Sequence, residues 1–120
     1  MSYSEKIKNV IEGSDVALFM KGTPAFVMCG NSDRALQALR RAGASVTAVD
    51  VLPDPAIRAE LTELYGWPTI PQVFVKGELV GGADIIEELE QSGDLEATLR
   101  EKLGDDYAAS RDEQTVALTA

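Results

Sequence analysis

The chain has 120 residues, of which 45% are hydrophobic, and this is enough for one modest core in one domain. Its 11 lysines and arginines stand against 20 aspartates and glutamates, so we do not expect a nucleic-acid-binding face. No segment is long and apolar enough to span a bilayer, and the first residues resemble neither a signal peptide nor a transit peptide. We therefore expect a cytoplasmic protein that binds neither nucleic acid nor membrane.

Two residue counts limit the chemistry further. The chain has no histidine, which excludes a Ser-His-Asp triad, a Cys-His dyad and every histidine-ligated metal site. It has one cysteine, Cys29, so it can form no intrachain disulfide and cannot complete a four-ligand thiolate site alone. Any redox or metal chemistry at Cys29 must therefore use thiols from another molecule.

The spacing of apolar residues predicts alternating helices and strands. In chain order we expect a helix over 3–12, a buried strand over 16–20, and a helix with Asn31 or Ser32 as its N-cap and a stop at Gly43. A strand over 46–51 and a helix over 55–65 that closes at Gly66 follow. The last elements are a hairpin with strands near 73–75 and 79–80 and helical turns over 85–99 with a break at Gly93. Alternating strands and helices favour parallel pairing, and the hairpin adds an antiparallel edge. This predicts an α/β fold with a four-stranded mixed sheet flanked by helices on both faces.

The end of the chain differs from the rest in composition. Residues 1–103 carry all the expected elements, whereas residues 104–120 are mostly polar and small. We therefore assign one domain to residues 1–103 and a flexible C-terminal tail to residues 104–120, with Tyr107 docking back onto the domain.

Cys29 is the first candidate for a functional residue. It follows a predicted strand and precedes a helix start, where free backbone N–H groups and the helix dipole favour an anion. A thiol in this place should have a lowered pKa, and Lys21 could add a positive charge nearby. A buried, inert structural cysteine is the alternative, and position alone does not decide between the two.

Three further features each allow a ligand-binding and a structural interpretation. A cis Ile70-Pro71 bond would present the backbone of Ile70 to a ligand, whereas a trans proline at a strand edge would have no such role. Asp84, after two glycines, could pair with a ligand amino group or could cap a helix. Arg58 could clamp a carboxylate or could be a solvated surface charge.

Taken together, four motifs in this order resemble the monothiol glutaredoxins of the Cys-Gly-Phe-Ser class. They are Met20-Lys21-Gly22-Thr23-Pro24, Cys29-Gly30-x-Ser32, Trp67-Pro68-Thr69-Ile70-Pro71-Gln72 and Gly81-Gly82-x-Asp84. The resemblance extends from the first helix to about Leu99. It implies a thioredoxin fold, a cis proline at Pro71, and glutathione bound across the helix that begins at Cys29.

The resemblance also assigns roles to individual residues. It implies that Lys21 and Arg58 hold the glycine carboxylate of glutathione, that Ile70 pairs with its cysteinyl backbone, that Ala83 and Asp84 hold its γ-glutamyl end, and that Cys29 ligates iron or forms a mixed disulfide. Members of the family carry a [2Fe–2S] cluster between two subunits. Since such a cluster needs four thiolates, two Cys29 residues of a homodimer and two glutathiones would supply them. Iron–sulfur acceptor proteins and a BolA-type protein are the implied further partners.

Two positions depart from the family pattern and leave the function open. Asn31 replaces the phenylalanine that would shield a cluster from water, and Ala83 replaces the second cysteine of many relatives. We rank an iron–sulfur carrier first. A glutathione-dependent oxidoreductase that removes glutathione from protein thiols at Cys29 comes second, with weak activity at most, and an inactive family member comes third.

Overall fold

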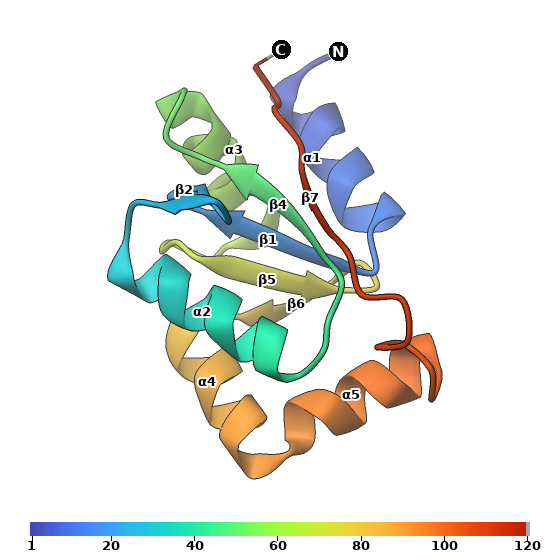
Figure 1. The fold of residues 1–120 in the computed structure, drawn as a ribbon. Coiled ribbons are helices and arrows are strands. Elements are labelled where there is room, and N and C mark those ends of the chain that lie inside the picture. The colour runs from blue at the N-terminus through green and yellow to red at the C-terminus, as the bar shows by residue number, and fades with distance from the viewer. Residues whose placement is uncertain (120) are drawn as a thin grey trace.

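The computed structural model describes residues 1–119 as a β-sheet between two layers of helices (Figure 1). The helices are α1 (Tyr3–Gly13), α2 (Gly30–Arg41), α3 (Pro55–Tyr65), α4 (Ala83–Ser92) and α5 (Asp94–Leu103). The strands are β1 (Val16–Met20), β2 (Gly22–Thr23), β3 (Phe26–Val27), β4 (Val46–Asp50), β5 (Gln72–Val75), β6 (Glu78–Gly81) and β7 (Glu113–Thr115). Among residues 1–119, no helix has the length and apolar character needed to cross a membrane.

The main sheet is mixed and has the strand order β6-β5-β1-β4-β7. Strand β1 pairs parallel with β4 and antiparallel with β5, and β5 pairs antiparallel with β6. The β5–β6 turn consists of Lys76 and Gly77, which both have positive φ angles (50° and 84°), as a tight two-residue hairpin turn requires. The expected α/β fold with a closing hairpin is therefore confirmed.

Side chains that alternate along β1 divide the core between the two helical layers. Val16, Leu18 and Met20 belong to a buried cluster with residues of α2, α4 and α5. Ala17 and Phe19 point to the other face and join residues of α1 and α3, where the ring of Phe19 meets that of Phe74 edge-on at 5.8 Å. Figure 1 shows these two layers on opposite sides of the sheet. Because every residue of β1 is buried, this strand reads as a continuous apolar run.

The helix ends follow from local sequence. Ser2 and Glu5 form a reciprocal capping box at the start of α1. At α3, the Asp54 side chain accepts a hydrogen bond from the Ala56 N–H, and the helix ends at Gly66 in the left-handed region (φ 71°). The sequence predicted this end at Gly66.

The sheet has five strands, so the expectation of four was wrong. The additional strand is β7, which pairs parallel with β4 at the sheet edge. Backbone hydrogen bonds from the Val46 N–H to the Asp112 oxygen and from the Val116 N–H to the Ala48 oxygen, both 2.9 Å, extend this pairing. The β7 sequence, Glu-Gln-Thr, has no apolar alternation, so its pairing comes from the open edge of β4 and not from a buried face.

The segment that supplies β7 was expected to be a flexible tail. The Tyr107 hydroxyl donates a 2.6 Å hydrogen bond to the Ala42 oxygen, which confirms the expected docking of Tyr107. The guanidinium of Arg40 pairs with both carboxylate oxygens of Glu113, each at 2.8 Å, and Leu118 is buried beside α1. Residue 120, the last of the expected tail, lies outside the described residues.

Candidate functional site

Helix α2 begins at Gly30, with Cys29 as its N-cap residue in an extended conformation. The sequence predicted Asn31 or Ser32 in this role, which was wrong. Both side chains are engaged elsewhere: the Ser32 hydroxyl accepts the Lys21 N–H at 3.0 Å, and the Asn31 amide oxygen accepts the Arg34 Nη1 at 3.1 Å. The single thiol of the chain therefore stands where a capping side chain is usually found.

The surroundings of Cys29 favour its thiolate form. Stabilisation of the thiolate by the backbone N–H of Ser32 is the main reason that the pKa of Cys29 lies below its ordinary value. Partial burial opposes this shift, whereas the Asn31 N–H, the Ser32 hydroxyl and the Lys21 ammonium add to it. Because Cys29 is also partly exposed, these features favour a reactive thiol over an inert one.

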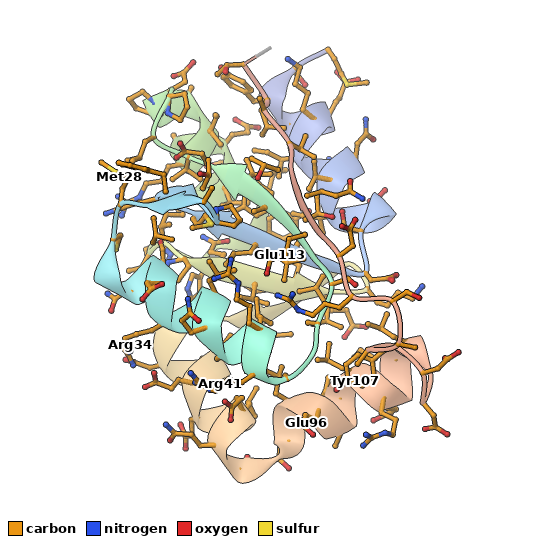
Figure 2. All side chains as sticks on the ribbon, in the orientation of Figure 1. Met28, Arg34, Arg41, Glu96, Tyr107 and Glu113 are labelled. Carbon is orange, nitrogen blue, oxygen red and sulfur yellow. The ribbon has the colours of Figure 1, made fainter. Side chains whose placement is uncertain are left out.

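The loop before Cys29 is held by backbone contacts. The Lys21 oxygen accepts the Met28 N–H at 3.0 Å, and the carboxylate of Asp50 accepts the Gly22 N–H at 2.9 Å. Gly22 has a φ of 91°, and a Cβ there would lie 2.4 Å from the oxygen of Phe26, so only glycine fits. Phe26 (73% exposed) and Met28 (57% exposed) place apolar side chains in solvent on this loop; Met28 is labelled in Figure 2.

A groove of about 410 Å³ lies next to the start of α2, and its first lining residue after Cys29 is Asn31. Three segments line it: the first turns of α2, the loop before β5, and the start of α4. The lining residues are Asn31, Arg34, Trp67, Thr69, Ile70, Pro71, Gly82, Ala83, Asp84 and Ile85. The sequence analysis assigned a role in binding glutathione or iron to six residues, and the groove brings together three of them, Ile70, Ala83 and Asp84.

The wall before β5 is a fixed loop. The Ile70-Pro71 peptide bond is cis, which is one of the two alternatives that the sequence left open and the one that the resemblance implied. The buried amide of Gln72 donates to the backbone oxygens of Trp67 (2.8 Å) and Thr69 (3.2 Å), and these two hydrogen bonds hold the loop in place.

Gly82, the N-cap residue of α4, allows α4 to lie close to the loop before β5 on the other side of the groove. A Cβ at Gly82 would lie 3.2 Å from the Pro71 oxygen, which is tighter than an ordinary contact, and 3.4 Å from Trp67 Nε1, which is an ordinary contact distance. The Trp67 Nε1 is buried and has no hydrogen-bond partner within residues 1–119. Gly82 also leaves the first N–H groups of α4 without a side-chain cap.

The remaining two residues singled out from the sequence lie beside the groove and do not line it. Lys21 contacts the start of α2 through its backbone, and its ammonium acts on Cys29 electrostatically. Arg58 extends from α3 to the loop before β5, where its Nη2 donates to the Pro68 oxygen at 3.2 Å. Both cations therefore lie next to segments that form the site.

Arg34 is a groove residue that the sequence analysis missed. Its Nη2 lies 2.8 Å from a carboxylate oxygen of Asp84, so it joins α2 to α4 across the groove. Spacing could have placed Arg34 on the same helix face as Asn31, three residues earlier. Its pairing with Asp84, 50 residues away, has no signal in the local sequence.

A second groove of about 410 Å³ lies at the other end of the sheet, between the end of α1, the start of β4 and β7. Hydroxyl, amide and acidic side chains such as Ser45, Gln114 and Asp112 line it, and no lysine or arginine of residues 1–119 does. It therefore offers no cation for a carboxylate, in contrast to the groove near Cys29.

The fold and the site together define a thioredoxin-type protein with a single thiol at a helix N-terminus. A sequence model of the family Glutaredoxin matches residues 16–80. Glutaredoxin 4 of Escherichia coli (strain K12) is 46% identical over 97 residues, which are 81% of this chain and 84% of that protein. The chain thus belongs to the glutaredoxin family, and it resembles the monothiol glutaredoxins within it.

Further relatives agree with this assignment. Monothiol glutaredoxin-S11 of rice (Oryza sativa subsp. japonica) is 46% identical over 100 residues, 83% of this chain, but the chain spans only 20% of the rice protein. The solution structure of a monomeric truncated mutant of Trypanosoma brucei 1-C-Grx1 has a TM-score of 0.76 at 41% identity, over 85% of this chain and 93% of that chain. A buckwheat glutaredoxin–glutathione complex has a TM-score of 0.72 at 25% identity, over 82% of this chain and 88% of that chain.

Proposed function

We propose that this protein binds glutathione and carries a [2Fe–2S] cluster as cargo for iron–sulfur cluster assembly or transfer. The observation that carries the proposal is a single, partly exposed thiol of lowered pKa beside a groove that holds both a cation and a carboxylate. A tripeptide with two carboxylates, one amino group and one thiol has chemistry that matches these groups. The buckwheat glutaredoxin that this chain resembles was solved with glutathione bound.

In the proposed complex, each end of glutathione meets groups of opposite charge. Lys21 and Arg58 hold the glycine carboxylate, the backbone of Ile70 pairs with the cysteinyl residue, and the γ-glutamyl end lies at Ala83 and Asp84. This arrangement directs the glutathione sulfur towards Cys29. The Ala83 side chain is not needed, because the contacts expected there use the backbone.

The count of thiols links cargo binding to dimer formation. Within residues 1–119 there is no group of three or more cysteine, histidine or acidic side chains placed to hold a metal ion. Two Cys29 thiolates from a homodimer and two glutathione thiolates provide the four ligands that a [2Fe–2S] cluster needs. The exposed side chains of Phe26 and Met28, in the loop before Cys29, suit coverage by a second subunit. Iron–sulfur acceptor proteins, and a BolA-type protein in place of one subunit, are the proposed partners, and a thiol that must stay reduced suits the cytoplasm.

Asn31 favours a second candidate function. Its exposed amide bonds to Arg34 and supplies no apolar shield for a cluster. In this alternative, the Cys29 thiolate attacks the glutathione sulfur of a protein–glutathione disulfide and releases the protein thiolate. A second glutathione thiolate then attacks the Cys29–glutathione disulfide, which releases oxidised glutathione and restores the Cys29 thiolate.

Anaerobic reconstitution with ferric iron, sulfide and glutathione tests the first function. We expect a visible-region cluster spectrum on a species that elutes as a dimer, and its loss when glutathione is omitted or Cys29 is changed to serine. Asn31→Phe should slow cluster loss in air, since it restores an apolar ring. A colourless monomer, or a cluster retained by Cys29→Ser, would contradict the carrier function, and deglutathionylation of a model protein would then test the alternative.

A further inference from the structure

An ion pair bridges the two walls of the groove at the end formed by α2 and α4. Arg34 of α2 and Asp84, in the first turn of α4, both line the groove, and their nearest charged atoms are 2.8 Å apart. The Asp84 side chain is 90% exposed and that of Arg34 is 40% exposed, so solvent and ligands reach both. Figure 2 labels Arg34 at the junction of these two helices.

The guanidinium of Arg34 is held in a defined orientation. Glu87, one helical turn after Asp84, accepts from Nε at 3.3 Å and from Nη2 at 2.9 Å, and Asn31 accepts from Nη1 at 3.1 Å. With Asp84 these contacts use four of the five N–H donors of an arginine. The second N–H of Nη1 has no acceptor among residues 1–119. A carboxylate can therefore add to this guanidinium without displacing any of its partners.

The charges around Arg34 have a net negative sum, which leaves a carboxylate available to a positively charged ligand group. Asp84 and Glu87 supply two negative charges against one positive charge, so an incoming ammonium group finds an exposed carboxylate at Asp84. The first N–H groups of α4, left without a side-chain cap at Gly82, lie beside the pair and add to the attraction for a carboxylate. A cation and an anion side by side are the complement of a zwitterion.

We infer that Arg34 and Asp84 together recognise the α-amino-acid head of a γ-glutamyl group, with Asp84 taking the ammonium and Arg34 the α-carboxylate. The inference rests on the proposed binding of glutathione and adds a residue, Arg34, that determines specificity for the γ-glutamyl end. It makes the site selective for γ-glutamyl thiols that keep both charged groups. Thiols of the same length that lack one of these groups lose one half of the recognition.

The test measures the equilibrium of mixed-disulfide formation between Cys29 and the disulfides of four thiols, followed by mass spectrometry. In each reaction the Cys29 thiolate attacks the disulfide, one thiolate leaves, and Cys29 keeps the other half. The four thiols are glutathione, 4-aminobutanoyl-Cys-Gly without the α-carboxylate, glutaryl-Cys-Gly without the amino group, and Cys-Gly. Any change in the pKa of Cys29 affects all four in the same way, so the ratios between ligands report on recognition alone.

We expect Arg34→Gln to lower the constant for glutathione by about tenfold, the size of one charge-assisted hydrogen bond, and to leave that for 4-aminobutanoyl-Cys-Gly unchanged. Arg34→Lys keeps the charge and should retain part of the preference. Arg41→Gln is the matched control, since Arg41 pairs with Glu90 between the same two helices but outside the groove, and it should change nothing.

The outcomes separate this inference from the proposed function. If the unchanged protein prefers glutathione to Cys-Gly but Arg34→Gln affects all thiols equally, or raises the constant for glutathione, the role of Arg34 is refuted and glutathione binding stands. If the unchanged protein does not distinguish glutathione from Cys-Gly, glutathione recognition in the groove fails, and the inference fails with it.

Discussion

Replacement of Leu118 by alanine tests whether the C-terminal segment is docked as an integral part of the domain. Leu118 is only 4% exposed and belongs to the core cluster that contains Ile7 and Ile11 of α1. Its backbone oxygen accepts a 2.7 Å hydrogen bond from the Lys6 ammonium, which fixes the segment beside α1. The substitution removes the side chain and leaves these backbone contacts in place.

The size of the effect follows from burial. A Leu→Ala change in a core costs about 2–5 kcal/mol, and the lower end applies here because the end of a chain can shift into the vacated space. A loss of about 2 kcal/mol lowers the Tm of a domain of this size by roughly 8 °C. Leu52→Ala is the matched control: Leu52 is 48% exposed, so the same chemical change should cost less than about 1 kcal/mol.

Thermal and urea unfolding of the full chain, followed by circular dichroism, would measure both variants. If Leu118→Ala lowers stability no more than Leu52→Ala, the segment is not docked in solution and the fifth strand is not a stable part of the sheet. Hydrogen exchange gives an independent check, since the Val116 N–H bonds to the Ala48 oxygen and should be protected in the unchanged chain.

Three further predictions concern the site and its supports. The rate of Cys29 alkylation against pH should have its midpoint below the ordinary cysteine pKa, and Lys21→Gln should raise it because a nearby positive charge is lost; a midpoint at the ordinary value would contradict this. Gly82→Ala should weaken glutathione binding severalfold and change Trp67 fluorescence, since the added Cβ crowds the Pro71 oxygen and contacts the Trp67 ring; unchanged binding and emission would show that the groove accommodates it. The pKa of Asp54 is lowered, mainly by the Ala56 N–H, so Asp54 stabilises the fold above its unfolded pKa of about 4 and this contribution is lost as pH falls below that value. Urea unfolding of Asp54→Asn should accordingly show a weaker dependence on pH between about 5 and 3 than the unchanged protein, and equal slopes would refute the assignment.

Much of the fold could be predicted from local sequence because its signals are local. The apolar run at β1 marks a strand buried on both faces, and Gly66 and the Lys76-Gly77 turn mark ends that need positive φ angles. The two-residue strands β2 and β3 were missed, because strands of that length carry no periodicity.

The candidate site was predictable only in part. Motif order placed Ile70 and Asp84 in one groove, and the position of Cys29 before a helix predicted its lowered pKa. The N-cap residue was predicted wrongly, because the sequence does not show that the Ser32 hydroxyl is already engaged by the Lys21 N–H. A side chain can cap a helix only if no other partner claims it.

The amino-acid sequence shows that this protein has one thiol and no histidine, and therefore that any cluster or disulfide at Cys29 needs a second molecule. The pairing of Arg34 with Asp84 and of Arg40 with Glu113, 50 and 73 residues apart, is visible only in the folded chain. Composition limits which chemical groups are available wherever they lie. Contacts between distant residues depend on how helices pack and which sheet edge stays open, and charged or polar surface residues leave no periodic pattern from which to predict them.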